Sequence, residues 1–206
     1  DSDRLPKHIK EDEERFNLVV GDICDITVSD LPSLSYIVNF AAESHVDNSI
    51  QDGRPFVRSN IEGVYNLLEI AKMQPKLRKF VQVSTDEVYG DMEDLRGSPE
   101  ATESFSLKPS SYYSATKAAA EMLVIAAHRT FNLPGPGQHA EKFLPTVFEA
   151  MRNNRPIPVY GDGLQIREWI HVSDHVSIMA NLMHSSYNAE TYNIGSGFSY
   201  TNLEVI

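Results

Sequence analysis

The six residues from Lys79 to Ser84 place the tightest constraint on how this chain folds. The run Lys-Phe-Val-Gln-Val-Ser is short and rich in valine and aromatic residue, which is typical of a strand buried on both faces of a parallel sheet. A hydroxyl, two carboxylates and a phenol follow at once, in the stretch 84–90. Because ligands of open α/β sheets bind outside the carboxyl ends of the strands, these polar groups are candidates for chemistry.

A second polar pair follows about two dozen residues later. Tyr113 and Lys117 open a helical pattern that runs to about Phe131, so they lie one turn apart on one helix face. A phenol has a solution pKa of about 10, and a nearby ammonium lowers that pKa because it favours the phenolate. Alone, the spacing also fits a packing tyrosine and a solvated lysine. After a strand that ends Ser-Thr-Asp-Glu, it indicates a proton-transfer pair.

The stretch 36–40 predicts another strand, which ends in Ala-Ala-Glu-Ser-His at 41–45. Small residues just past a strand let a planar cofactor approach the backbone, although an ordinary strand exit gives the same pattern. Apolar spacing predicts helices over 55–73, 113–131, 143–151 and from Ser173 or Asp174 to His184, with a further helix beginning at Asn202. Further strands are expected at 17–20, 156–160, 166–172 and 190–195, and Gly161 to Gly163 is expected to form a turn.

Composition excludes several classes of function. The chain has 206 residues, with 18 Lys and Arg against 29 Asp and Glu, which argues against a nucleic-acid partner. No apolar stretch is long enough to span a membrane and no signal peptide opens the sequence, so we expect no membrane partner and a cytoplasmic location. Cys24 is the single cysteine, which excludes an internal disulfide and predicts a buried thiol. His171, Asp174 and His175 lack a fourth ligand at a typical spacing, so no metal is expected.

Four motifs together resemble one family. They are Gly-Asp-Ile-Cys-Asp at 21–25, Ala-Ala-Glu-Ser-His-Val-Asp at 41–47, Ser-Thr-Asp-Glu-Val-Tyr-Gly at 84–90 and Tyr-Ser-Ala-Thr-Lys at 113–117. The chain resembles, from about Leu18 to Ile206, the nucleotide-sugar 4,6-dehydratases of the dTDP-glucose 4,6-dehydratase type, in the extended short-chain dehydrogenase/reductase superfamily. The adjacent acids Asp86 and Glu87 are the discriminating feature, since the related 4-epimerases and decarboxylases usually lack the pair.

The resemblance implies an α/β fold: a Rossmann-type doubly wound parallel sheet with a smaller C-terminal substrate-binding part. We expect an NAD-binding domain over 1–134 and a substrate-binding part over 135–206. The Gly-rich turn that binds a dinucleotide is absent from the sequence, so the chain is expected to begin after the first strands. A strand is likewise expected to be missing between Pro134 and Gly135, and the C-terminal lobe to be incomplete.

The resemblance also assigns site residues, with NAD as the cofactor and a nucleotide sugar as the substrate. The expected catalytic residues are Thr85, Asp86, Glu87, Tyr113 and Lys117. The expected cofactor-binding residues are Asp22, Ile23, Phe40, Ala41, Ala42, Ser44, Ser59, Val83, Ser84, Tyr113 and Lys117. The expected substrate-binding residues are Ser44, Thr85, Glu141, Lys142, Arg167 and Asn193, of which Arg167 is suited to a diphosphate because its guanidinium is planar and bidentate.

The expected reaction is dehydration of an NDP-hexose, dTDP-glucose by resemblance, to the 4-keto-6-deoxy sugar. Tyr113 takes the C4 hydroxyl proton, Glu87 removes the C5 proton and Asp86 protonates the leaving C6 hydroxyl, because one acid must act as base and the other as acid. A 4-epimerase or a uronic-acid decarboxylase remains an alternative on the same fold, and a non-enzymatic NAD-binding module is a third. A homodimer is expected through the helices at 55–73 and 111–131.

Overall fold

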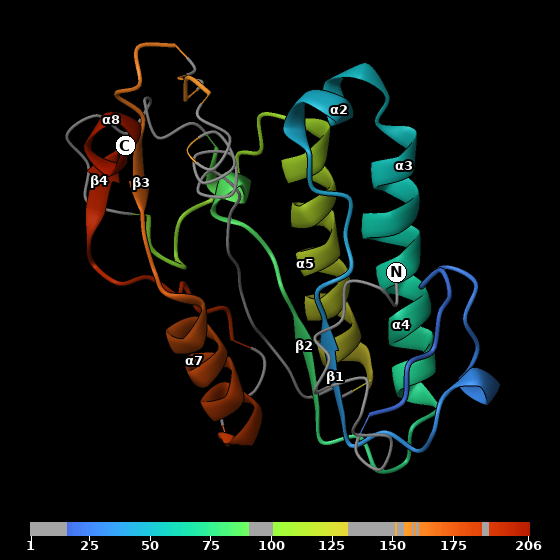
Figure 1. The fold of residues 1–206 in the computed structure, drawn as a ribbon. Helices are drawn as coiled ribbons and strands as arrows, with labels where there is room; N and C mark the ends of the chain where they lie inside the picture. The colour runs from blue at the N-terminus through green and yellow to red at the C-terminus, as the bar shows by residue number, and fades with distance from the viewer. Residues whose placement is uncertain are drawn as a thin grey trace.

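A parallel pair of strands forms the centre of the protein (Figure 1). The computed structural model describes residues 16–90, 101–131, 151, 155–157, 159, 161–186 and 190–206. Strand β1 (Tyr36–Asn39) pairs with β2 (Lys79–Gln82), with Ile37 opposite Phe80 and Val38 opposite Val81. The strands predicted at 36–40 and 79–84 are therefore confirmed, each one or two residues shorter than the apolar pattern.

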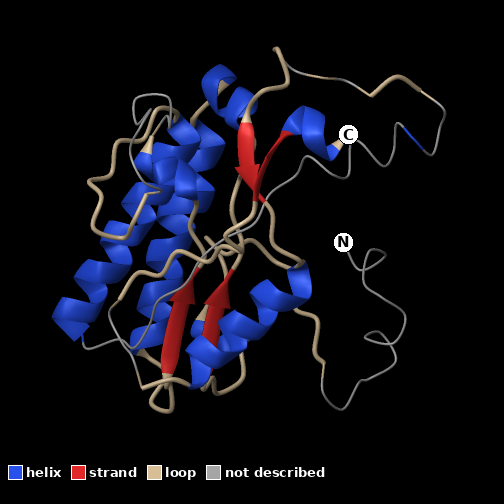
Figure 2. Cartoon of the chain, turned by 90° about the vertical axis from the view of Figure 1, so that its left-hand side faces the viewer, coloured by secondary structure: helices blue, strands red, loops and turns tan. Residues whose placement is uncertain are grey.

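Helices cover both faces of this strand pair, as Figure 2 shows from the side. Ile37 and Phe80 belong to a core with α4 (Gly63–Lys72) and α5 (Tyr112–Phe131). On the other face, Val81 packs with Met179 of α7 (Val172–His184). Burial on both faces is what the continuous apolar run in β2 predicted, and the doubly wound α/β arrangement is confirmed.

The helix predicted at 55–73 is present, with an irregularity that its apolar spacing did not show. Helix α3 (Arg54–Val57) has its proline in the first turn, a π-helical segment η3 (Arg58–Glu62) follows, and α4 completes the run. A short helix α2 (Val46–Gln51) precedes them, and a 3₁₀ turn η2 spans Val28–Asp30. At the start of α5, Ser111 Oγ accepts a hydrogen bond from the backbone N–H of Ser114, which satisfies a donor of the first helical turn.

The C-terminal part contains a small antiparallel sheet of β3 (Ile166–Glu168) and β4 (Ser199–Thr201), followed by α8 (Asn202–Val205). The turn at Gly161 to Gly163 and the helix beginning at Asn202 are confirmed. The predicted cap of α7 was wrong. His171 is the N-cap, and its ring nitrogen Nδ1 accepts a hydrogen bond from the Ser173 backbone N–H. Serine and aspartate are the usual N-caps, which is why the sequence favoured them.

Two predicted strands were wrong, and a third is only partly described. The segment 17–20 forms no strand, and Leu18, Val19 and Val20 are exposed. The segment 190–195 is irregular, and so are the described residues of 156–160. The strand predicted at 166–172 shortens to β3. A strand exists only with a hydrogen-bonded neighbour, and apolar alternation in one segment does not supply that neighbour.

Several predictions lie outside the described residues. They concern Glu141, Lys142, nearly all of the helix at 143–151, and the expected gap between Pro134 and Gly135. Within the described part of the chain, none of the helices combines the length and the apolar character needed to cross a bilayer.

Candidate active site

The carboxyl end of β2 runs into a short 3₁₀ helix, η4 (Asp86–Tyr89), that displays the two predicted acids. Thr85 is fully buried and caps this helix, because its Oγ1 accepts the backbone N–H of Glu87 at 3.2 Å. The same hydroxyl donates to Asp86 Oδ1 at 3.3 Å. Asp86 is exposed and Glu87 is half-buried. The cap fixes the backbone of both acids, so their side chains leave the sheet edge from a defined point.

Lys117 is held against the last residues of β2. Its side chain is 4% exposed, and its Nζ donates to the carbonyl oxygen of Val83 at 2.5 Å. Gln82 Nε2 donates to the same oxygen at 2.9 Å. Burial lowers the pKa of Lys117 to about 8, against which the charge of Glu121 acts in the opposite direction. The ammonium is therefore present at neutral pH but loses its proton far more readily than a solvated lysine.

Tyr113 lies one turn before Lys117 in α5 and is 2% exposed. Its ring packs edge-to-face on Phe56, with ring centroids 6.4 Å apart. The neighbouring Tyr112 is 60% exposed, so these two tyrosines point in opposite directions. The structure thus brings Tyr113 and Lys117 to the buried side of α5, and α5 also contacts η4 through Ala118, which packs with Val88 and Tyr89.

The loop after β1 is fixed by Asn60, a residue that the sequence did not single out. Asn60 Oδ1 accepts the Glu43 backbone N–H at 2.8 Å, and its Nδ2 donates to the Glu43 carbonyl at 3.0 Å and to Thr116 Oγ1 at 3.0 Å. Its three partners hold the predicted cofactor wall, residues 40–44, to the helix that carries Lys117. A polar residue inside an otherwise amphipathic run was the available signal. Within this wall Phe40 is 60% exposed, while Ala42 and Ser44 are half-buried.

The predicted cofactor-binding residues Asp22 and Ile23 lie on a turn at 21–26. Asp22 Oδ1 accepts the Cys24 backbone N–H at 2.8 Å, and Asp22 Oδ2 pairs with Arg58 at 3.1 Å. Ile23 packs against the main core, and its carbonyl accepts from Asn66. Ser59 follows Arg58 in the π-helical segment and is half-buried. Burial and the neighbouring Asp22 raise the pKa of Cys24 to about 11, which is unfavourable for a nucleophile.

The C-terminal candidates Arg167 and Asn193 lie in different surroundings. Arg167 is exposed on β3, in the second sheet. Asn193 is exposed, and its Oδ1 accepts from the Tyr89 hydroxyl at 3.0 Å while its Nδ2 donates to the Ala101 carbonyl at 3.0 Å. Asn193 therefore connects η4 to the loop at 101–108. Burial raises the pKa of Tyr89, and the charges of Glu121, Glu103 and Asp86 add to the rise.

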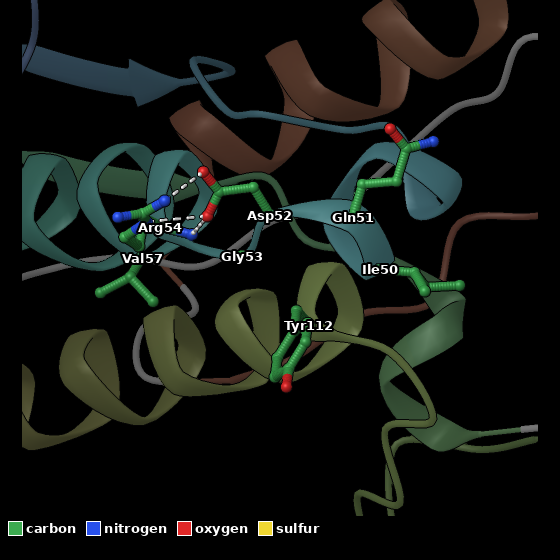
Figure 3. A pocket seen from close by; sticks show the side chains of 7 residues that line it. All are labelled: Ile50, Gln51, Asp52, Gly53, Arg54, Val57 and Tyr112. Carbon is green, nitrogen blue, oxygen red and sulfur yellow. Dashed lines mark hydrogen bonds and ion pairs between the residues drawn. The ribbon is translucent and has the colours of Figure 1, made fainter.

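A cavity of about 390 Å³ lies beside the N-terminal end of α5 (Figure 3). Its lining comes from α2, the start of α3 and the exposed ring of Tyr112, and Asp52 and Arg54 form an ion pair at 3.0 Å on its rim. None of the predicted catalytic side chains lines it. Among the described residues, no group of three His, Cys, Asp or Glu side chains is arranged to hold a metal.

Comparison with known proteins decides the family. The model of the NAD dependent epimerase/dehydratase family matches residues 2–195. The chain belongs to this family. The low-salt glycan biosynthesis protein Agl12 of Haloferax volcanii is 41% identical over 98% of this chain and 67% of its own length. The dTDP-glucose 4,6-dehydratase of Haemophilus influenzae is 40% identical over 95% of this chain and 64% of its own length. The resemblance to the 4,6-dehydratases is thereby confirmed.

Solved members of the family share the fold. The dTDP-glucose 4,6-dehydratase DesIV of Streptomyces venezuelae, a double mutant solved with NAD, superposes with a TM-score of 0.86 at 35% identity, over 96% of this chain and 63% of its own. The UDP-glucuronic acid 4-epimerase of Bacillus cereus, solved with NAD, gives a TM-score of 0.85 at 26% identity, over 96% and 65%. The chain thus spans about two thirds of the length of these relatives. The Rossmann-type fold is common to both activities, so it does not choose between them.

Proposed function

We propose that this protein is an NAD-dependent dehydratase of a nucleotide hexose, with dTDP-glucose as the substrate. The observation that carries the proposal is the arrangement at the end of β2. There Thr85 caps η4, and the two acids of η4, Asp86 and Glu87, lie beside the helix that contains Tyr113 and Lys117. A tyrosine and a lysine suffice to exchange a proton with a sugar hydroxyl. Two adjacent carboxylates are needed in addition only when water must be eliminated, because that step requires both a base and an acid.

Each of these side chains has a step in the proposed reaction. Tyr113, with its phenolate favoured by the Lys117 ammonium, accepts the proton of the C4 hydroxyl, and Thr85 hydrogen-bonds the C4 oxygen. Glu87 removes the C5 proton, which the 4-keto group makes acidic, and Asp86 donates a proton to the C6 hydroxyl so that water leaves. Bound NAD supplies the hydride acceptor at C4 and the hydride donor at C6, so the cofactor ends unchanged.

The residues present fit the nicotinamide half of NAD. Exposed Phe40 offers an aromatic face, and the small residues Ala41 and Ala42 leave the backbone accessible just past β1. Val83, Ser84 and Lys117 supply the polar edge at the end of β2. Ser44, Ser59, Asp22 and Ile23 are the proposed remaining contacts to NAD. The pyrophosphate-binding glycine turn is not in this sequence, so these residues hold one part of the cofactor.

The second part of the chain is proposed to bind the nucleotide sugar. We assign NAD binding to residues 1–134 and substrate binding to 135–206. Arg167 is proposed to hold the diphosphate and Asn193 the nucleotide, with Glu141 and Lys142 facing the sugar and Ser44 reaching the substrate from the cofactor side. Exposure of Arg167 on β3 leaves its guanidinium free to take phosphate oxygens in a bidentate way.

A 4-epimerase is the second candidate, because the Bacillus cereus epimerase has nearly the same TM-score as the dehydratase DesIV. One experiment separates the two. The full-length protein is incubated with dTDP-, UDP-, GDP- and CDP-glucose, and the products are analysed by mass spectrometry. Loss of one water from the sugar supports the dehydratase. A product of unchanged mass with inverted C4, or no product at all, refutes it.

We also propose a cytoplasmic homodimer. Large apolar side chains stay exposed on the two helices that the resemblance places at a dimer contact: Val57, Tyr65, Met73, Tyr112 and Met122. An exposed apolar surface of this kind is typical of an interface between subunits. Replacing Tyr65 and Met122 by glutamate should shift the sedimentation coefficient to that of a monomer. An unchanged coefficient would place the contact elsewhere.

A further inference from the structure

Glu121 is a half-buried acid to which the proposed reaction gives no step. It lies one turn after Lys117 in α5 and accepts a short hydrogen bond from Ser84 Oγ. Ser84 directly follows Val83, whose carbonyl accepts the Lys117 ammonium. Two consecutive residues at the end of β2 are therefore bound by two residues of α5 that are one helical turn apart. This double attachment fixes the strand end to the helix beside the acids.

The charges of Glu121 and Lys117 support one another. Burial raises the pKa of Glu121, whereas the Ser84 hydrogen bond and the Lys117 charge lower it. Burial lowers the pKa of Lys117, whereas Glu121 raises it. Of the charged residues in the described part of the chain, only Glu121 shifts the Lys117 pKa. Each charge thus opposes the effect of burial on the pKa of the other residue.

Other titratable groups face this pair from neighbouring elements. Tyr113 lies one turn earlier in α5. The charge of Glu121 also raises the pKa of Tyr89 in η4, as do the charges of Glu103 and Asp86. On the far side of β2, His175 of α7 is buried one turn before Met179, which packs on Val81 and Val83. A change of charge at Glu121 therefore acts on Lys117 and also on Tyr89.

A purely structural role does not account for an acid at this position. An apolar side chain of similar size would pack against the end of the sheet without the cost of desolvating a carboxylate. A carboxylate retained beside the reactive lysine has a use if that lysine must stay charged. Its hydrogen bond from Ser84 also fixes the position of that charge.

We propose that Glu121 is a positioning residue that holds Lys117 charged and in place at the end of β2, and so controls proton transfer by Tyr113. This inference rests on the dehydratase function proposed above. Loss of the Glu121 charge is expected to let Lys117 lose its proton at lower pH. The phenolate of Tyr113 then loses its partner, and turnover falls on the alkaline side of the pH profile.

The test replaces Glu121 by glutamine, which keeps the length of the side chain and an oxygen that accepts from Ser84. Brief pulses of acetic anhydride at a series of pH values, followed by peptide mass spectrometry, give the pH midpoint at which Lys117 becomes reactive. In the wild-type protein we expect a midpoint near 8. In E121Q we expect it about one unit lower. The control E69Q changes a half-buried acid on α4 that pairs with Lys72, and it should leave the Lys117 midpoint unchanged.

The second readout is the pH dependence of kcat. The pH at which kcat falls on the alkaline side should be lower in E121Q than in the wild-type protein. In E121D, which keeps a carboxylate, it should be close to the wild-type value, and KM should change little in both variants. Lower thermal stability of E121Q with an unchanged Lys117 midpoint would overturn the proposal. If E121Q does not fold, Glu121→Met provides the test: it removes the carboxylate and keeps most of the side-chain length, so it must lower the midpoint, and an unchanged midpoint again overturns the proposal. Acetylation needs no substrate, so failure of this inference is distinguishable from failure of the proposed dehydratase function.

Discussion

Asn60 donates a 3.0 Å hydrogen bond to Thr116 Oγ1, and this bond joins the loop after β1 to the residue directly before Lys117. Both side chains are buried. Thr116 Oγ1 in turn donates to the Tyr113 carbonyl at 2.8 Å. The proposed cofactor wall and the proposed proton-transfer helix are thus held by one polar network, so disturbance of one is expected to reach the other.

Removal of Asn60 should cost both stability and cofactor affinity. Asn60→Ala leaves the backbone N–H and carbonyl of Glu43 without their side-chain partner and removes the donor to Thr116 Oγ1, whose bond to the Tyr113 carbonyl remains; each buried unsatisfied group costs about 1–3 kcal/mol. Urea denaturation should show a loss of about 2 kcal/mol or more, and calorimetry should show weaker NAD binding. Thr116→Ser is the matched control, because it keeps the hydroxyl. Wild-type NAD affinity in the N60A protein would contradict the proposal that residues 40–44 form part of the NAD site.

The buried Lys117 should make stability depend on pH in a defined direction. Its pKa falls from 10.5 to about 8 on folding. Between these values the unfolded chain binds the proton and the folded chain does not, so the free energy of unfolding rises with pH across the window. Below about pH 8 the charged Lys117 is buried and lowers the free energy of unfolding, by about 3 kcal/mol for a pKa shift of this size. The wild-type protein should therefore gain stability relative to Lys117→Met between pH 8 and 10.5, as measured by urea denaturation. A constant difference would contradict the low pKa.

Gly90 should be needed to keep the acids in place. Its φ is +90°, a backbone conformation that side chains with a Cβ rarely adopt, and a Cβ there would collide with the Lys108 carbonyl. Lys108 also donates from its backbone to the Val88 carbonyl at 2.9 Å. Gly90→Ala should cost about 1–3 kcal/mol and lower kcat, because η4 must move. Gly197→Ala is the control: its φ is +77° with open space around it, so it carries strain without a collision. Equal effects on kcat in the two variants would exclude displacement of η4.

Lys79 should be required for docking of α7. Its buried ammonium donates to the Leu182 carbonyl at 2.6 Å and to the Ser185 carbonyl at 3.0 Å, at the negative end of that helix. Lys79→Met should reduce the free energy of unfolding by about 2–3 kcal/mol, since charged hydrogen bonds are lost and carbonyls stay buried. Lys76→Met, at an exposed turn residue, should be close to neutral. Hydrogen exchange in α7 should rise in K79M alone.

The sequence predicted the elements whose signals are local. The strand at 79–84 and the long helix after Ser111 were predicted correctly, because the pattern of residues close together in the sequence indicates burial and helical spacing. Asn60 and Glu121 were missed, because each looks like an ordinary polar position on a helix until the partner strand or loop is in place. The strand predicted at 17–20 was wrong, because its apolar pattern is local but a strand also needs a paired neighbour, and the described structure holds none. His171 was missed because histidine is an uncommon cap.

The proposed division of labour between the two acids has the most direct test. The double variant Asp86→Asn with Glu87→Gln keeps the size and polarity of both side chains and leaves Tyr113 and Lys117 intact. It is mixed with dTDP-glucose in deuterated water, and the sugar is analysed by mass spectrometry. The account predicts a 4-keto sugar that still carries its C6 hydroxyl, with no deuterium at C5. No dehydrated product should form. Dehydrated product at the wild-type rate would contradict it.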